Sequence, residues 1–192
     1  MGVIIMGGQF RGRKLATDNS SEIIRPTSGK VREALFSSLG ERLVDATVVD
    51  LYAGSGSVGL EAASRGASEV HLVENHAKSW ALLKDNIKTV LGEHADSSRV
   101  FPVHSEALAF CRRMREAGRS FDFVFADPPF ADDFSLLRDA VLGILAKSGK
   151  GVIQFPARNP PNWLEDGVKL GTIKMKRYGE SGLAFLDAIF QA

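Results

Sequence analysis

The sequence has little of several features that mark specialised protein classes. One cysteine, Cys111, excludes an internal disulfide and a cysteine-rich metal site, as expected in a reducing compartment. The four histidines, His71, His76, His94 and His104, lack the spacing of metal ligands. The 24 Lys and Arg are balanced by 23 Asp and Glu, so no global basic field attracts a polyanion. No run is long and apolar enough for a signal peptide or membrane span. We therefore expect a cytoplasmic protein without metal or membrane attachment.

The remaining composition is that of an ordinary globular domain. With 192 residues, 44% of them apolar and 24% charged, the chain can bury one core. From residue 47 onward, strand-like and helix-like segments alternate, which predicts an α/β fold with a Rossmann-like, doubly wound and mostly parallel sheet of seven strands. The expected elements are strands at 47–52, 69–74, 99–103, 121–127 and 151–155, and helices at about 57–65, 77–91, 106–117 and 133–146.

Both ends of the chain depart from this alternation. Strand-like runs at 168–175 and 183–190 are separated only by residues 176–182, which predicts an antiparallel C-terminal hairpin at the sheet edge. The N-terminal stretch is rich in glycine and basic residues, which predicts a small basic β-hairpin extension over residues 1–24. The main domain is then expected over residues 25–192.

The tetrapeptide Asp127-Pro128-Pro129-Phe130 follows the apolar run 121–126. Two consecutive prolines cannot continue a strand ladder or a helix, so the strand must end there. A carboxylate and an aromatic ring are thus held at the carboxyl end of a strand, where open α/β sheets usually bind ligands. Taken alone, the same residues are also compatible with a plain turn.

A second motif follows the strand expected at 47–52. Asp50 precedes the glycine turn Gly54-Ser55-Gly56, and Glu74 closes the next strand. The glycines let a ligand approach the backbone closely, and a carboxylate at the second strand tip can accept hydrogen bonds from two ribose hydroxyls. With Gly59, the spacing fits a dinucleotide-binding fingerprint, but Asp50 stands where a pyrophosphate would want no carboxylate.

A cationic nucleoside cofactor suits these residues better. The amino group and positive sulfur of S-adenosylmethionine would favour the carboxylate of Asp50. After the third strand, Glu106 could reach an adenine amino group, or it could be a solvated carboxylate in the first turn of a helix.

Together the motifs resemble a known family. The residues Asp50-Leu51-Tyr52-Ala53-Gly54-Ser55-Gly56, Glu74 and Asp127-Pro128-Pro129-Phe130 look like those of class I S-adenosylmethionine-dependent methyltransferases that act on exocyclic amino groups. A narrower set is similar to the RsmD family of bacterial 16S ribosomal RNA guanine-N2 methyltransferases: Gly8-x-x-x-Gly12-Arg13-x-Leu15, Arg25-Pro26-Thr27-Ser28 with Val31-Arg32-Glu33-Ala34-Leu35-Phe36, and Lys176-Arg177-Tyr178-Gly179. The match runs from about Gly7 to Phe190, and it departs from the family pattern at Gly29-Lys30 and Glu106.

The resemblance implies methylation of the N2 amino group of a guanine in 16S rRNA. The partner would be 16S rRNA or the assembling 30S subunit, and we expect the protein to act as a monomer. An adenine-N6 methyltransferase acting on DNA or RNA, and a non-catalytic cofactor-binding ribosome-assembly protein, stay open as alternatives. The implied cofactor-binding residues are Asp50, Tyr52, Ala53, Gly54, Ser55, Gly56, Glu74, Asn75, Glu106 and Ala107.

The tetrapeptide suits chemistry on an exocyclic amine. The carboxylate of Asp127 and the carbonyl of Pro128 can accept the two N–H groups, which directs the nitrogen lone pair at the methyl group. Pro129 adds rigidity, and Phe130 would stack on the base. An RNA backbone also needs cations beside the pocket, although each cation alone fits a plain surface charge. The RNA-binding candidates are Arg11, Arg13, Lys14, Arg25 and Arg32.

Overall fold

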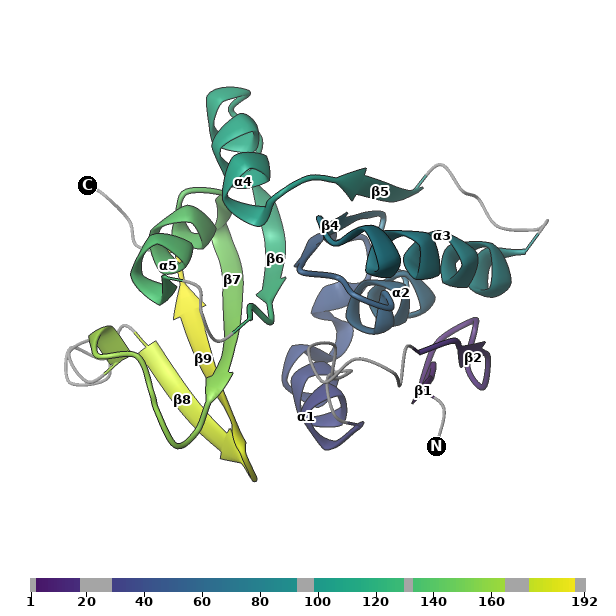
Figure 1. The fold of residues 1–192 in the computed structure, drawn as a ribbon, viewed down its shortest axis with the longest axis horizontal. Helices are drawn as coiled ribbons and strands as arrows, with labels where there is room; N and C mark the ends of the chain where they lie inside the picture. The colour runs from purple at the N-terminus through teal and green to yellow at the C-terminus, as the bar shows by residue number, and fades with distance from the viewer. Residues whose placement is uncertain (1–2, 18–28, 93–98, 130–132, 165–172, 189–192) are drawn as a thin grey trace.

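One mixed sheet of seven strands organises the described part of the chain. The structure, a computed structural model, describes residues 3–17, 29–92, 99–129, 133–164 and 173–188. The strands lie in the order β5-β4-β3-β6-β7-β9-β8 (Figure 1). Strands β3 to β7 pair in parallel, whereas β9 runs antiparallel to β7 and β8 antiparallel to β9. Their bounds are β3 Thr47–Leu51, β4 Glu69–Glu74, β5 Val100–His104, β6 Phe121–Ala126, β7 Leu145–Pro156, β8 Ile173–Tyr178 and β9 Ser181–Asp187.

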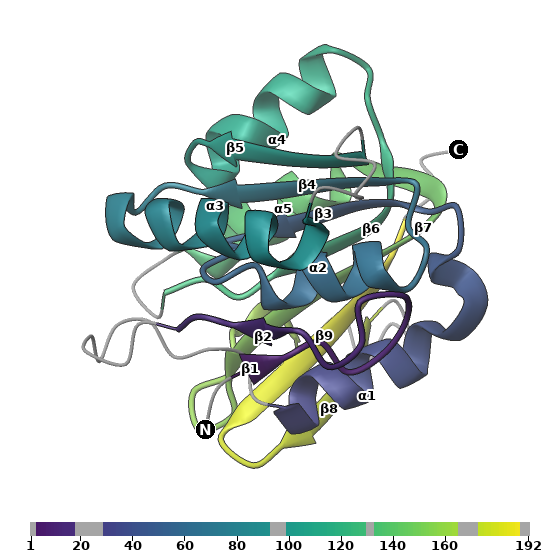
Figure 2. The ribbon, with the colours of Figure 1, turned by 90° about the vertical axis from the view of Figure 1, so that its right-hand side faces the viewer.

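Helices cover both faces of this sheet (Figures 1 and 2). One face carries α1 (Gly29–Leu39), the short 3-10 helix η1 (Gly40–Leu43), α2 (Ser57–Ser64) and α3 (Ala77–Leu91); the other carries α4 (Ala107–Glu116) and α5 (Phe134–Leu142). Strand β6 is buried on both sides, with Phe123 and Phe125 in the core under α1–α3, and Val124 and Ala126 in the core under α4 and α5. This two-sided burial explains its continuous apolar run. The predicted doubly wound α/β fold is therefore confirmed.

Two element boundaries were wrong. The helix expected over 133–146 ends at Leu142, and β7 already begins at Leu145. The apolar residues after Gly143 fit a helical period, but Ile144 accepts a 2.8 Å hydrogen bond from the Phe121 amide, and Leu145 pairs with Phe121 in the sheet. Sheet pairing here outweighs local propensity.

The C-terminal hairpin is present with a shorter turn than expected. Strands β8 and β9 are joined by Gly179 and Glu180 alone, and Gly179 has a φ of +62°. Residues 176–178, expected in the turn, instead pair with β9. The remainder of the expected first run, 168–172, lies outside the described residues.

The N-terminal extension forms the predicted small hairpin, in which β1 (Val3–Ile4) pairs antiparallel with β2 (Lys14–Leu15). Ile5 and Leu15 are buried in the same core as α2 and α3. Gly8, at a φ of +75°, lies so close to α2 that an added Cβ would be 1.8 Å from the Ser64 carbonyl oxygen. The hairpin is therefore packed against the main domain. The expected boundary between residues 24 and 25 lies outside the described residues.

Among the described residues, no helix is long and apolar enough to cross a membrane.

Candidate active site

The turn after β3 crosses the carboxyl end of β4. Tyr52 has a φ of +62°, a left-handed conformation that is costly for a bulky residue and is found mostly where the surrounding structure imposes it. The next two amides explain what holds the turn: Ala53 donates to the Val73 carbonyl at 2.9 Å, and Gly54 donates to Glu74 Oε2 at 2.8 Å. The glycine turn is therefore fixed on the end of the neighbouring strand.

Glu74 connects the glycine turn to the residues that follow β4. While Oε2 accepts from Gly54, Oε1 accepts from the His76 amide at 2.7 Å, and the side chain is 8% exposed. A carboxylate oxygen has more than one lone pair, so both oxygens keep acceptor capacity toward a ligand. Its position at the tip of β4 is the one from which a ribose would be recognised.

Asp50 lies under the glycine turn at the start of α2. Its Oδ2 accepts the Gly59 amide at 2.8 Å, and the side chain is 2% exposed. Burial raises the pKa of Asp50 to about 8; the Gly59 hydrogen bond opposes the rise, and the carboxylates of Asp127 and Glu74 add to it. Asp127 and Glu74, at the ends of β6 and β4, thus both act on Asp50 near the end of β3. Such a group favours binding of a cation.

Gly59 is required by this packing. An added Cβ would be 2.1 Å from Leu72 Cδ2 and 3.2 Å from the Cβ of Asp50. Because no side chain fits, the first turn of α2 lies directly against β3 and β4, and its amide reaches the Asp50 carboxylate. The third glycine of the motif therefore serves close helix–sheet packing.

The tetrapeptide begins where β6 ends. Ala126 pairs with Leu51 on one side and Ile153 on the other, so Asp127 leaves the sheet between β3 and β7. Pro128 is buried, whereas Pro129 is exposed. Phe130 lies outside the described residues.

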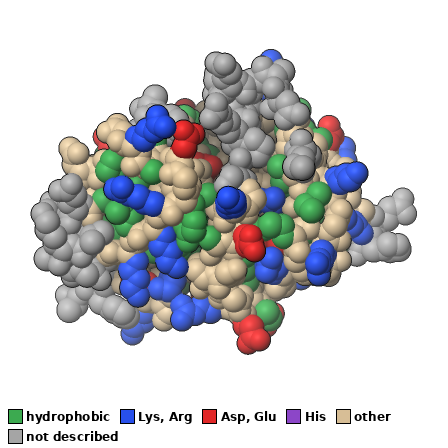
Figure 3. Space-filling model, turned by 90° about the horizontal axis from the view of Figure 1, so that it is seen from below, with side chains coloured by type: hydrophobic (Ala, Val, Ile, Leu, Met, Phe, Trp, Pro, Cys, Tyr) green, Lys and Arg blue, Asp and Glu red, His purple; other side chains and the backbone are tan. Residues whose placement is uncertain are grey.

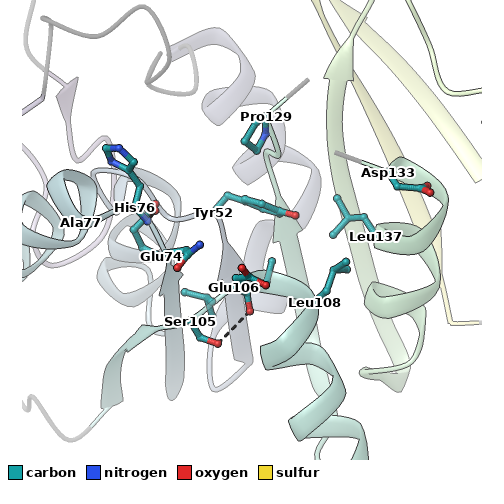
Figure 4. Close-up of a pocket in the computed structure, with 13 residues that line it drawn as sticks. Tyr52, Glu74, His76, Ala77, Ser105, Glu106, Leu108, Pro129, Asp133 and Leu137 are labelled. Atoms are coloured by element: carbon teal, nitrogen blue, oxygen red, sulfur yellow. Dashed lines mark hydrogen bonds between the residues drawn. The ribbon is translucent and has the colours of Figure 1, made fainter. Parts of the chain in front are cut away.

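A cavity of about 690 Å³ opens beside these strand ends (Figure 4). Tyr52, Glu74 and Glu106 are directed toward it from three different strand ends, with Pro129 on its far side. Glu106 is the N-cap residue of α4, and its carboxylate makes no capping hydrogen bond. The carboxylate is therefore not used as a helix cap and is exposed at the cavity wall.

The cavity brings together part of the predicted site. Six predicted residues line it: Tyr52, Glu74, Asn75, Glu106, Ala107 and Pro129. The other predicted residues that the structure describes are not among those that line it: Asp50, Ala53, Gly54, Ser55, Gly56, Asp127 and Pro128. Sequence reasoning missed further lining residues: Val73, His76, Ala77, Ser105, Leu108, Asp133 and Leu137. Four of these adjoin predicted residues in sequence, which was the only available signal: Val73, His76, Ser105 and Leu108. Asp133 and Leu137 come from the start and first turn of α5 and are brought in by the fold.

The predicted RNA-binding cations occupy different environments. Arg11, Arg13 and Lys14 are exposed, but the Arg13 guanidinium also bonds to the Val90 carbonyl of α3. Arg32 is 4% exposed and donates to the Ile4 carbonyl at 3.0 Å, and burial lowers its pKa. Its placement does not support an RNA contact.

Arg25, the remaining predicted RNA-binding residue, lies outside the described residues.

The partner of Arg32 is Glu61, a fully buried carboxylate of α2 whose Oε2 lies 3.9 Å from Arg32 Nη1. Glu61 also accepts from the Met6 amide at 2.6 Å and pairs with Arg65 at 2.7 Å. Arg32 and Glu61 therefore hold the hairpin, α1 and α2 together, a role that the sequence did not indicate.

Within the described ranges, no group of three or more His, Cys, Asp or Glu side chains is arranged to hold a metal ion.

The sheet order and the strand-end site define a Rossmann-like methyltransferase fold. A solved structure of an S-adenosylmethionine-dependent methyltransferase from Agrobacterium tumefaciens has the same fold, with a TM-score of 0.67 at 16% identity, covering 93% of this chain and 68% of that one. A hypothetical protein from Thermus thermophilus is closer, with a TM-score of 0.78 at 30% identity over 96% of this chain and 99% of its own.

The chain belongs to the family described as conserved hypothetical protein 95, whose model matches residues 3–187. A relative from Escherichia coli strain K12, named ribosomal RNA small subunit methyltransferase D, is 39% identical over 170 residues, which cover 83% of this chain and 80% of the relative. The resemblance to the RsmD family is thereby confirmed.

Proposed function

We propose that this protein transfers a methyl group from S-adenosylmethionine to the exocyclic N2 amino group of a guanine in 16S ribosomal RNA. The observation that carries the proposal is the parallel pairing of β3 with β6, in which Leu51 lies opposite Ala126, because it brings the cofactor-type carboxylate of Asp50 and the Asp-Pro-Pro motif to adjacent strand ends. The Escherichia coli relative, named for methylation of small-subunit ribosomal RNA, supports the substrate class.

The cofactor is assigned to the turn and the cavity. Asp50 would stabilise the positive charge of the methionine part, and Glu74 would accept the ribose hydroxyls. Glu106 and the residues around Asn75 and Ala107 would enclose the adenine. The donor set fits a cationic nucleoside, because the charged side chains known at these strand ends are acidic. Bound there, S-adenosylmethionine supplies an electrophilic methyl group.

The residues of the tetrapeptide would prepare the attacking nitrogen. The lone pair of an exocyclic guanine amine is delocalised into the ring, so the amine is a poor nucleophile. Asp127 and the Pro128 carbonyl would accept its two N–H groups and direct the lone pair at the methyl carbon. S-adenosylmethionine would supply the methyl group to this nitrogen, and its sulfur would keep the electron pair of the S–C bond. Asp127 or water would take the proton that the methylated nitrogen loses.

The target base must leave any helix to reach this pocket, and Phe130 would stack on it. The hairpin cations Arg11, Arg13 and Lys14 would contact the RNA backbone. Exposed basic residues of β8, Lys174, Lys176 and Arg177, would add to this contact, since β8 and the hairpin both lie in the lower part of the molecule in Figures 1 and 2. Seen from below, Lys and Arg side chains are widespread (Figure 3). We propose residues 1–24 as an RNA-contacting extension of a catalytic domain over 25–192.

The remaining proposals concern the protein in the cell. We propose a cytoplasmic monomer that acts on 16S rRNA or on the assembling 30S subunit, without a metal ion.

The test is methyl transfer from labelled S-adenosylmethionine to undermethylated 30S subunits and to free 16S rRNA, followed by nucleoside analysis. Labelled N2-methylguanosine is the expected product. Labelled N6-methyladenine would replace the proposal with an adenine methyltransferase. Cofactor binding without transfer to either substrate would point to a non-catalytic assembly protein.

A further inference from the structure

A single buried amide connects the N-terminal extension to the glycine turn. Asn86 lies in α3 and is 1% exposed. Its Oδ1 accepts the Ala16 amide at 2.8 Å, and its Nδ2 donates to the Ala16 carbonyl at 2.9 Å and to the Ser55 carbonyl at 2.8 Å. Both amide protons of the side chain are thus used, one on each segment.

The Ser55 contact reaches the centre of the candidate cofactor site. Ser55 lies between Gly54, which is tied to Glu74, and Gly56, whose amide donates to the Ala53 carbonyl at 2.7 Å. A second residue of α3 also supports the turn: a Cβ added to Gly56 would be 2.6 Å from Leu83 Cδ1. The position of α3 therefore determines where the turn can lie.

The Ala16 contact is part of a longer attachment of the hairpin to the same helix. Within the next turn of α3, the Val90 and Thr89 carbonyls accept from the Arg13 guanidinium. Figures 1 and 2 both show β1 and β2 beside α2 and α3. The hairpin is thus attached to α3 through Asn86 and Arg13, and Asn86 also attaches α3 to the turn.

We propose that Asn86 is a positioning residue that couples the N-terminal extension to the cofactor turn, so that binding of RNA and binding of the cofactor affect each other. This inference rests on the proposed function, in which the hairpin contacts RNA and the turn holds S-adenosylmethionine. The physical basis is the buried Ser55 carbonyl, which loses its partner when the Asn86 amide is removed or displaced. A shift of either segment then alters the affinity at the other, and linkage makes the effect reciprocal.

The test compares Asn86→Ala with Ser64→Ala. Ser64 attaches the hairpin to α2 by accepting the Phe10 amide at 2.9 Å and donating to the Gly7 carbonyl at 2.6 Å, and no described contact joins it to Ser55. Both variants loosen the hairpin, but only Asn86→Ala releases the turn. Asn86→Leu is the second variant: it has a similar side-chain volume but no hydrogen-bond donor for the Ser55 carbonyl, and it serves if the alanine variant does not fold by circular dichroism.

The first readout is the dissociation constant of S-adenosylhomocysteine, measured by calorimetry. We expect Asn86→Ala or Asn86→Leu to weaken binding about tenfold, because one buried hydrogen bond to the turn is lost. Amide exchange of residues 53–57 should accelerate in the same variants. Ser64→Ala keeps the hydrogen bond between Asn86 and the Ser55 carbonyl, so its effect on both should be several times smaller. Equal effects of the Asn86 and Ser64 variants would reduce Asn86 to a hairpin anchor, and no effect of the Asn86 variants would also overturn the inference.

The second readout is the coupling itself. In the wild type, undermethylated 30S subunits should change the affinity for S-adenosylhomocysteine, and the Asn86 variants should bring that factor close to one. A wild type with no coupling, or a factor unchanged in the variants, refutes the inference. A wild type that binds no S-adenosylhomocysteine at all would instead refute the proposed function.

Discussion

The buried carboxyl of Asp50 gives the stability of this protein a specific pH dependence. Burial raises the pKa of Asp50 from 3.8 to about 8. The folded protein therefore holds this proton up to about pH 8, whereas the unfolded chain releases it near pH 4. The contribution of Asp50 to the free energy of unfolding is highest below about pH 4, falls as the pH rises, and is lost by about pH 8.

The size of this effect follows from one proton held only by the folded state. The free energy of unfolding should fall by about 1.4 kcal/mol per pH unit within that window, or about 3 kcal/mol between about pH 5 and about pH 7. Asp50→Asn removes the titration and keeps an acceptor for the Gly59 amide. The stability difference between variant and wild type should therefore grow with pH in favour of the variant.

Urea unfolding of both proteins at several pH values and constant ionic strength measures this difference. All other titrating groups are shared, so they cancel in the comparison. A difference that stays constant between about pH 5 and about pH 7 would refute the assignment of a protonated Asp50.

Binding of the cofactor should release the same proton from Asp50. If the positive charge of S-adenosylmethionine pairs with ionised Asp50, binding near pH 7 releases about 0.9 proton in the wild type and none at this position in Asp50→Asn. Calorimetry in two buffers of different ionisation enthalpy measures the release. Tight binding without proton release in the wild type would contradict the contact between Asp50 and the cofactor charge.

Three further predictions test other parts of the site. Asp127→Ala should abolish methyl transfer while S-adenosylhomocysteine binding stays within about threefold of the wild type; lost binding with an intact fold would contradict its role. Arg11→Ala combined with Lys14→Ala, which spares the structural contacts of Arg13, should weaken RNA binding and flatten its salt dependence, and an unchanged slope would exclude the hairpin from the interface. Gly59→Ala should cost about 1–3 kcal/mol in urea unfolding, because its Cβ would be 2.1 Å from Leu72 Cδ2; unchanged stability would show that α2 can shift.

The central strands could be predicted because local pattern and tertiary role agree there. Strand β4 has the predicted bounds of residues 69–74, and β6 differs only in its last residue. Both bury apolar residues on two faces: β6 is apolar except at Asp122, and β4 buries Val70, Leu72 and Val73. A carboxylate follows each apolar run. The carboxylate after each run also identified Glu74 and Asp127 as candidate site residues.

Elements at the sheet edge were harder to predict, because their side chains follow no single pattern of polar and apolar residues. In β8 the run Lys174–Arg177 is exposed, and the polarity of Lys176 and Arg177 resembled a turn, although both residues pair with β9. The boundary at Gly143 was missed for a related reason: a sheet partner 20 or more residues away decides it, and no local pattern encodes that partner.

The buried polar residues that organise the site could not be found from sequence. Asn86 and Glu61 are polar residues within helices, and polar residues in helices lie far more often on the solvated surface than in the core. Their roles depend on segments distant in sequence, Ala16 and Ser55 for Asn86, and Met6 and Arg32 for Glu61. These roles became visible only in the structure, where the N-terminal hairpin packs against α2 and α3.

The start of α2 bears on the choice between a dinucleotide and a sulfonium cofactor. In dinucleotide-binding folds, the free amides at the start of this helix bind the pyrophosphate. Here the Gly59 amide, in the first turn of α2, already donates to Asp50 Oδ2 at 2.8 Å, and Glu74 takes the Gly54 amide. A phosphate at this position would have to displace protein carboxyl groups and approach Asp127 as well. The same acidic groups stabilise a cation. The glycine spacing fits both cofactors, but the hydrogen bonds from the Gly54 and Gly59 amides to carboxyl groups favour the sulfonium cofactor.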